Sequence, residues 1–302
     1  MTKENNIRVK MFRVEGDVVP FVQVDYLDKE AKEHTGLLLL DSGSNINLLA
    51  PEMDEEIGDL CKLEGERTII HSMAEGTVEA EKAKFIFAMG GKQFGEVFCL
   101  CPQKFPVSVA GIKVLGLLGN EFFLKHRLVI DYSDYTLHTS EVDPSNLSIS
   151  DCGFFFPMNI GLEYYDVPVI SIKQNGKELV TLIDTGATNN MIAKLALKEN
   201  KFKHKWLEEK GHVVNVTGEL DVEEAQVWFK IMSLNGNGVR RISRHFLFKV
   251  LPCNIHTLPE GSCDANGEEL PPVEVLLGAP FMAREKWVLD FGAKIMYKRK
   301  VA

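Results

Sequence analysis

The sequence lacks any apolar run that approaches the length of a membrane-spanning helix, and we therefore expect no transmembrane segment. Its first residues show no basic region followed by an apolar core, which predicts no signal peptide and a cytoplasmic location. A precursor with a removed signal or anchor stays compatible with the sequence. Positive charge is in deficit, with 34 Lys and Arg against 43 Asp and Glu and a net charge of −9. This balance argues against a nucleic-acid or anionic-membrane partner.

The cysteines form no CxxC pair and no Cys/His group with the spacing of zinc ligands, so the sequence predicts no metal site. We expect reduced thiols, as in a cytoplasmic protein. Cys253 and Cys263 bracket a loop, however, and would form a disulfide if the protein were exported. The six cysteines are Cys61, Cys99, Cys101, Cys152, Cys253 and Cys263.

With 302 residues, the chain can form one large domain or two of moderate size. Its hydrophobic content of 45% and charged content of 25% are typical of a soluble globular protein. Apolar and polar residues alternate over many short stretches, beginning at residues 7–27. This periodicity predicts a mainly β protein with few short helices.

The second half of the chain repeats the order of the first, and residues 276–296 match residues 117–137 without a gap. Two β-rich lobes with the same internal order imply a duplication and, most simply, a pseudo-twofold arrangement. We therefore predict an N-terminal lobe at residues 1–142, a connector at 143–162 and a C-terminal lobe at 163–302.

Two short stretches, residues 37–44 (LLLLDSGS) and 180–187 (VTLIDTGA), occupy matching places in the two halves. Each is an apolar run that predicts a buried strand, followed by an acid, a hydroxyl residue and a glycine. One such triplet is ordinary turn chemistry, but two in matching contexts indicate a shared site. Because equivalent points meet at a pseudo-twofold axis, Asp41 and Asp184 are predicted to lie together.

Two carboxyls within hydrogen-bond reach cannot both ionise easily, so one pKa falls, the other rises, and the pair holds a single proton over a range of pH. Such a pair can activate a water as general base while the partner donates a proton to a carbonyl oxygen. The result is direct amide hydrolysis, which needs no metal, cofactor or covalent intermediate.

The chain resembles the aspartic proteases of the pepsin and retroviral-protease superfamily over nearly its whole length. The two acid triplets carry this likeness together with the motifs LLG at residues 117–119 and LLG at residues 276–278, which follow in the order that the family has. The resemblance implies two homologous pepsin-like or retropepsin-like β-barrel lobes related by a pseudo-twofold axis. It also implies a monomer that cleaves a polypeptide substrate.

By this resemblance, Asp41 and Asp184 are the catalytic pair, and Ser42 and Thr185 lock the two loops through reciprocal hydrogen bonds. The residues implied to leave room for the water and the scissile carbonyl are Gly43 and Gly186.

The residue after each triplet differs between the halves, Ser44 in the first and Ala187 in the second. The resemblance implies that Ser44 bonds the outer oxygen of Asp41, which alanine cannot do for Asp184. This asymmetry favours Asp41 as the member of the pair with the lower pKa.

Hairpins near residues 71–78 and 213–220 occupy the places of substrate-covering flaps in this family. Two flaps resemble a retroviral dimer fused into one chain, whereas pepsin has one flap, with a tyrosine that residues 68–80 lack. The residues implied as flap or substrate contacts are Met73, Ala74, Gly76, Thr217 and Gly218.

Further expectations concern structure rather than chemistry. Asp131 and Asp290, at matching positions, are expected to turn the closing hairpins rather than to act as extra acids. Residues 120–125 and 191–207 have helical patterns, and the residues expected to fill the core of the second lobe are Trp228 and Trp287.

Two functions from different classes remain. The first is an active monomeric endopeptidase with its cleft between the lobes, and the second is a catalytically silent peptide-binding protein that keeps the same fold. The presence of both acids, each with its hydroxyl residue and glycine, favours the enzyme, because a binding protein does not need an energetically costly carboxylate pair.

Overall fold

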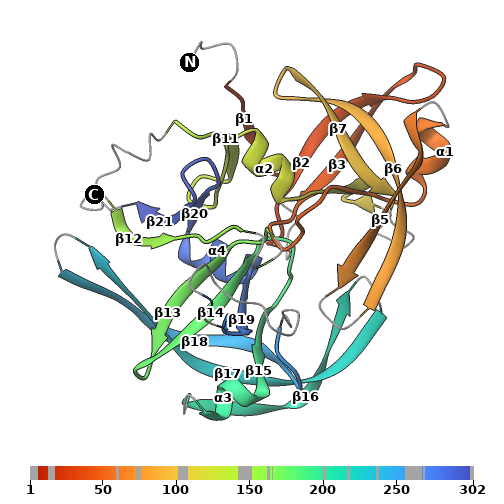
Figure 1. Cartoon of the computed structure of the whole chain (residues 1–302). Coiled ribbons are helices and arrows are strands. Elements are labelled where there is room, and N and C mark those ends of the chain that lie inside the picture. The colour runs from red at the N-terminus through yellow and green to blue at the C-terminus, as the bar shows by residue number, and fades with distance from the viewer. Residues whose placement is uncertain are drawn as a thin grey trace.

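Strands dominate the computed structural model of the chain (Figure 1). The only helices among the described residues are α1 (Met53–Ile57), α2 (Asn120–Lys125), α3 (Lys194–Glu199) and α4 (Ala279–Glu285). None of them has the length and apolar character that crossing a membrane would require. The mainly β fold with few short helices that the sequence predicts is confirmed. The described residues are 6–12, 18–58, 61–72, 76–100, 108–141, 152–161, 164, 166–199, 202–215, 218–235, 238–255, 267 and 269–299.

The first lobe is built on one strongly curved sheet. Pairing of β2 with β6, which sets Asp25 opposite Ala88, closes this sheet into a barrel. Its strands, in spatial order, are β2 (Phe21–Leu27), β3 (Glu33–Leu40), β9 (Ile112–Leu118), β4 (Leu48–Leu49), β7 (Lys92–Leu100), β6 (Gly76–Met89) and β5 (Lys62–Ser72), with β8 (Ser108–Val109) beside β9.

The second lobe repeats this order strand by strand. In spatial order its strands are β13 (Val169–Gln174), β14 (Lys177–Asp184), β19 (Val273–Gly278), β15 (Asn190–Ala193), β18 (Gly238–Leu251), β17 (Gly218–Asn235) and β16 (His204–Asn215). In both lobes the strand before the acid runs parallel to a strand of the second motif, β3 beside β9 and β14 beside β19. The predicted internal repeat is confirmed.

A third sheet joins the two halves of the chain. Its strands, in spatial order, are β1 (Arg8–Lys10), β11 (Thr136–Thr139), β10 (Leu128–Asp131), β20 (Val288–Asp290), β21 (Ile295–Arg299) and β12 (Cys152–Pro157). At its centre β10 and β20 run antiparallel with Ile130 opposite Leu289. These two residues are equivalent in the repeat, so the pseudo-twofold axis passes through this pair.

The predicted limits of the lobes stay a prediction. Strand β12 lies inside the predicted connector, residues 143–162, and pairs with β21 at the edge of the shared sheet.

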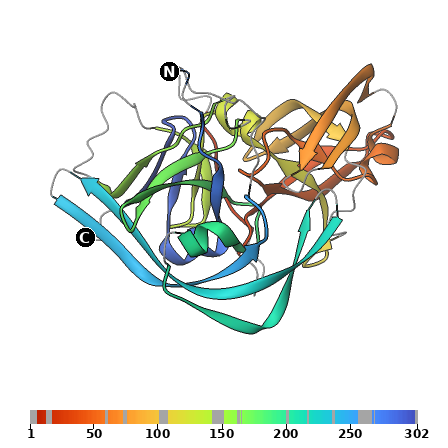
Figure 2. The same ribbon diagram turned by 60° about the horizontal axis from the view of Figure 1, so that its bottom comes forward.

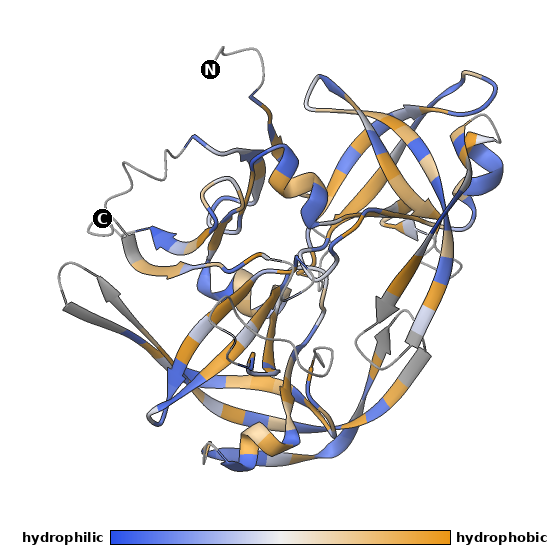
Figure 3. Ribbon diagram, in the orientation of Figure 1, coloured by the Kyte–Doolittle hydropathy of each residue, from blue (hydrophilic) through white to orange (hydrophobic). Residues whose placement is uncertain are grey.

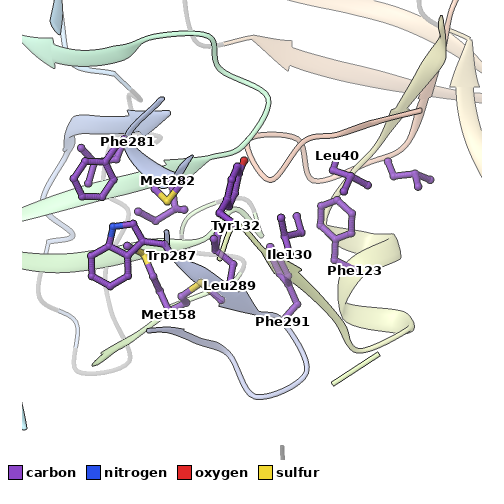
Figure 4. Packing of buried hydrophobic residues seen from close by; sticks show 14 of the residues in the cluster. Leu40, Phe123, Ile130, Tyr132, Met158, Phe281, Met282, Trp287, Leu289 and Phe291 are labelled. Carbon is purple, nitrogen blue, oxygen red and sulfur yellow. The ribbon is translucent and has the colours of Figure 1, made fainter. Parts of the chain in front are cut away.

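The main core is one cluster that includes buried side chains of both lobes and of the shared sheet. Figure 4 shows side chains of both halves in one cluster, among them Phe123, Tyr132, Trp287 and Phe291. The ring of Trp287 is fully buried beside Phe281, Phe154 and Phe156. Along the strands, apolar and polar residues alternate as the sequence pattern predicts (Figure 3).

The closing hairpins follow the expectation for Asp131 and Asp290. Asp131 accepts hydrogen bonds from the N–H (2.7 Å) and the hydroxyl (2.6 Å) of Ser133, and Asp290 accepts the N–H of Ala293 at 2.8 Å. Asp290 also accepts the hydroxyl of Ser140 at 2.7 Å, which ties the first half to the second. Both carboxyls therefore have structural roles.

Two expectations were wrong. Residues 191–207 are not one helix, because β15 begins at Asn190 and pairs with β18 and β19, α3 is short, and β16 begins at His204. Trp228 is only partly buried, on the face of β17 opposite to the core, where it packs edge-on to His245. Helix α2 and the burial of Trp287 are as predicted. The cysteines Cys61, Cys99 and Cys253 are free thiols.

The burial of Trp287 yields a stability prediction. We expect Trp287→Ala to lower the free energy of unfolding by about 3–5 kcal/mol, because it leaves a large cavity in the core that both halves share. Trp206, which is 39% exposed, supplies the matched control, and Trp206→Ala should cost less than about 1 kcal/mol. Urea unfolding followed by fluorescence measures both, and equal losses would contradict the assigned core.

Candidate active site

Each of the two predicted acids stands where a buried strand ends. Asp41 follows β3, and its N–H donates to the carbonyl of Leu118 on the neighbouring strand β9 at 3.0 Å. Asp184 is the last residue of β14 and pairs in register with Gly278 of β19. The two strand pairs are equivalent in the repeat, and the structure brings the two acids together at the boundary of the lobes. The two carboxyl groups lie close enough for each to act on the pKa of the other.

Reciprocal hydrogen bonds lock the two loops. The N–H of Ser42 donates to Oγ1 of Thr185 at 3.0 Å, and the N–H of Thr185 donates to Oγ of Ser42 at 3.0 Å. Each hydroxyl then donates across the boundary, Ser42 to the carbonyl of Ile183 at 2.7 Å and Thr185 to that of Leu40 at 2.6 Å. All four bonds cross between the lobes in a fully buried environment, so they fix the relative position of the acids.

The glycine of each triplet packs against the acid of the other. A Cβ on Gly43 would lie 2.5 Å from Cγ of Asp184, and a Cβ on Gly186 would lie 2.4 Å from Cγ of Asp41. No real Cβ contact is this close, so any side chain here would push the carboxyls apart. The glycines also donate their N–H groups to the acid two residues before them, at 2.8 Å and 2.9 Å.

Burial raises the pKa of both acids, and the raised pKa of Asp41 is also due to the nearby charge of Asp184. Because the two carboxyls act on each other, the pair shares one proton rather than losing both at the ordinary pH of an aspartate. Asp184 is stabilised as the anion by three backbone N–H groups, those of Gly186, Ala187 and Gly43. The pair therefore titrates as a unit that keeps one proton well above the ordinary range of an aspartate.

The expected asymmetry at Ser44 and Ala187 was wrong in its cause. The hydroxyl of Ser44 donates to the carbonyl of Ile46 at 2.7 Å, and it is the backbone N–H of Ser44 that acts on Asp41. The N–H of Ala187 likewise donates to Asp184, at 3.0 Å. Backbone N–H groups thus stabilise the carboxylates of both acids, whereas the sequence suggested that a side chain would do so for Asp41 alone.

Sequence reasoning missed two asparagines that hold the loops. Nδ2 of Asn47 donates to the carbonyl of Val97 at 3.1 Å, while its Oδ1 accepts the N–H of Gly119 at 3.0 Å. Asn190 makes the same pair of bonds, from Nδ2 to Leu247 at 3.1 Å and from the N–H of Gly278 at 3.0 Å. Each asparagine lies six residues after its acid, and this equal spacing is a signal that the sequence contains.

A third asparagine, Asn120, acts on one side only. Its Nδ2 donates to the carbonyl of Ser42 at 2.7 Å, whereas the repeat has Ala279 at the matching place. Support of the Asp41 loop by a side chain of α2 therefore has no counterpart at Asp184.

The two hairpins predicted as flaps reach toward each other from opposite lobes. Strand β5 pairs with β6 up to Ser72 opposite Gly76, and β16 pairs with β17 up to Asn215 opposite Gly218. Figures 1 and 2 both show these strand ends converging between the lobes. The structure thus places Gly76 and Gly218 at the starts of β6 and β17, while the remaining predicted flap contacts, Met73, Ala74 and Thr217, lie outside the described residues.

The arrangement supplies a proton donor next to a carboxylate, with Asp41 partly exposed and Asp184 buried. Chemically, it can hold a water between the two acids and move protons to and from a bound group. Within the described ranges, no three His, Cys, Asp or Glu side chains gather closely enough to bind a metal ion.

No protein-family model matches the sequence, and no curated protein sequence matches it. Solved structures, in contrast, match over almost the whole chain. An aspartic proteinase from Irpex lacteus is 11% identical, with a TM-score of 0.57 and 98% of each chain covered. Basic 7S globulin from soybean is 12% identical, with a TM-score of 0.54, 98% of this chain and 97% of that chain covered. Since one is named as a proteinase and the other as a globulin, the likeness concerns fold and not activity. The chain therefore has the two-lobed, mainly β fold of the pepsin-like aspartic proteinases.

Proposed function

We propose that this protein is an aspartic endopeptidase that hydrolyses peptide bonds with a water activated by Asp41 and Asp184. The observation that carries the proposal is the packing of each acid against the glycine of the opposite loop, fixed by the reciprocal bonds of Ser42 and Thr185. Holding a buried acid against a second, partly exposed acid is unfavourable for stability, and proton transfer to and from a substrate is the function that this arrangement fits best.

In the proposed reaction Asp184, which accepts the N–H groups of Gly186 and Ala187, starts as the anion, and Asp41 starts with the proton. Asp184, the anion, accepts a proton from the water as its oxygen attacks the carbonyl carbon of the peptide bond. Asp41 donates its proton to the carbonyl oxygen, and a tetrahedral diol forms. When the carbon–nitrogen bond breaks, a carboxyl of the pair donates a proton to the departing amine and the other recovers one from the diol. Atoms and charges balance, and the pair returns to its starting state.

The substrate is proposed to be an extended polypeptide that lies between the acids and the two converging hairpins. An extended chain can pair with the ends of β5, β6, β16 and β17 through its backbone, which is a general mode of peptide recognition. Since both acids come from one chain, we further propose that the monomer is the active form.

A second candidate function is a peptide-binding protein without catalytic activity. The likeness to a globulin with the same fold favours it, because this fold is not restricted to proteins named as proteinases. Both functions share the substrate position, and only the fate of the bound peptide separates them.

Loss of either acid tests the proposal. We expect Asp41→Asn and Asp184→Asn each to lower kcat/KM for a denatured protein substrate by about 10³-fold or more, because each removes one of two coupled proton-transfer groups. A statine-type inhibitor should block the wild type. The matched control is Asp25→Asn, at an exposed position on β2, which should keep full activity. Equal cleavage by the wild type and both variants would contradict the pair, and binding of peptides without cleavage would favour the second function.

The shared proton also predicts how stability depends on pH. An unfolded aspartate has a pKa of 3.8, whereas the folded pair keeps its proton to higher pH. Stability from this site is therefore fully present below pH 3.8 and is lost as pH rises through the raised pKa of the pair. We expect Asp41→Asn to raise the melting temperature by roughly 2–6 °C at pH 7, but to change it little at pH 3.5.

Scanning calorimetry at both pH values measures this effect, with Asp25→Asn again as the control that removes an exposed carboxyl. A fall in melting temperature for Asp41→Asn of the same size at both pH values would show that the folded pair holds no extra proton.

A further inference from the structure

One polar group in the core that joins the lobes has no use in the mechanism above. Tyr132 follows β10 and is fully buried, with 0% of its surface exposed, yet its hydroxyl has no hydrogen-bond partner among the described residues. A buried hydroxyl without a partner loses its hydrogen bonds to water and gains none in return. It therefore destabilises the fold unless something other than the chain, such as an internal water, bonds to it.

The repeat shows that the fold itself needs only the ring. The matching residue is Phe291, which is equally buried. The N–H of Tyr132 donates to the carbonyl of Trp287 at 3.0 Å, and the N–H of Phe291 donates to that of Leu128 at 2.9 Å. These two bonds are equivalent, so the two aromatic residues differ only in the hydroxyl group.

The hydroxyl lies near the acid pair. Tyr132 belongs to the same buried cluster as Leu40 and Ile183, the residues directly before the two acids, and Figure 4 shows its hydroxyl at the edge of that cluster. Burial, the neighbouring Tyr135, and then the charges of Asp184 and Asp41 raise the pKa of Tyr132 well above that of an ordinary tyrosine. It is therefore a neutral donor at any pH at which the pair titrates. Tyr135, Asp184 and Asp41 are the titratable groups that act on it.

A second buried atom on the same half is also without a partner. Nδ2 of Asn120 holds the Asp41 loop through Ser42, but Oδ1 of the same side chain accepts no hydrogen bond from the described residues. At the matching place the repeat has Ala279. The first half thus carries two unused polar atoms beside the acidic loops, and the second half carries none at the equivalent positions.

We propose that Tyr132 is a positioning residue for the acid pair, and that its hydroxyl holds an internal water against the side of the Asp41 and Asp184 loops that faces the shared sheet. Tyr132 donates to the water, and the water donates to the loops. Buried waters typically take about three such bonds, and Oδ1 of Asn120, whose Nδ2 bonds the carbonyl of Ser42, is the further acceptor that we propose. A donor directed at the pair favours its ionised states, so both ionisations of the pair occur at lower pH than they would without it.

The test uses Tyr132→Phe, which keeps the ring that the repeat tolerates, and Tyr135→Phe, which removes a hydroxyl from the ring packed against it at 5.9 Å. We expect both limbs of the pH profile of kcat/KM to shift to higher pH, by about 0.5 pH unit or more, in Tyr132→Phe. Tyr135→Phe should leave both limbs where they are in the wild type. Unchanged limbs in an active Tyr132→Phe variant would overturn the proposal.

This activity measurement rests on the proposed proteolysis, so a second measurement is independent of it. Relative to the wild type, Tyr132→Phe should have a lower free energy of unfolding at pH 7, where the pair is charged, than it has at pH 3.5. In an Asp41→Asn background this pH dependence should shrink. The same change at both pH values would mean that the hydroxyl does not act on the pair, even if the protein cleaves nothing.

A crystal structure tests the water directly. Density for a water within about 3 Å of Oη of Tyr132, and within the same distance of an atom of residues 41–44 or 184–187, is the expected result. The same site should be empty in Tyr132→Phe. The proposal would be contradicted if no water density lay next to Oη of Tyr132 at a resolution that shows other internal waters.

Discussion

The bonds that Ser42 and Thr185 exchange across the lobes are the constraint on which the rest of the site depends. Two carboxyls repel each other once the second proton leaves, and nothing in the acids themselves would keep them in contact. Because the residue after each acid is bonded to the opposite loop through both its N–H and its hydroxyl, the acids cannot separate without breaking four buried hydrogen bonds. The glycines then allow the carboxyls to approach as closely as the lock requires.

The shared sheet gives this lock a rigid base. Strands β10 and β20 meet at the pseudo-twofold axis, and the side chains above and below them come from both halves, so the lobes are continuous in their core rather than merely in contact. Asn47 and Asn190 connect each acidic loop to a neighbouring strand of its own lobe. Each acidic loop is therefore held both by its own lobe and by the loop on the other side of the axis.

Repetition made much of this predictable from the sequence. Asp41 and Asp184 could be placed together because the same pattern occurs twice, and duplication implies an axis. Residues 191–207 could not be assigned correctly, because the partner strands of β15 lie far along the chain and override a local helical pattern. The role of Ser44 failed for another reason, since a short hydroxyl side chain in a turn can bond to several backbone groups and only the folded loop decides which.

Joining two similar halves in a single chain has a consequence for the chemistry that they share. When one gene encodes a symmetric dimer, every substitution appears on both sides of the axis. Here Asn120 corresponds to Ala279 in the repeat, and Tyr132 corresponds to Phe291. The two halves therefore differ at equivalent positions. A polypeptide has a direction, from its amino to its carboxyl end, and a symmetric receptor cannot match that polarity. If the proposed reaction holds, a fused chain with unequal halves can assign one acid to the incoming nucleophile and the other to the carbonyl oxygen, in a fixed orientation along the bound strand.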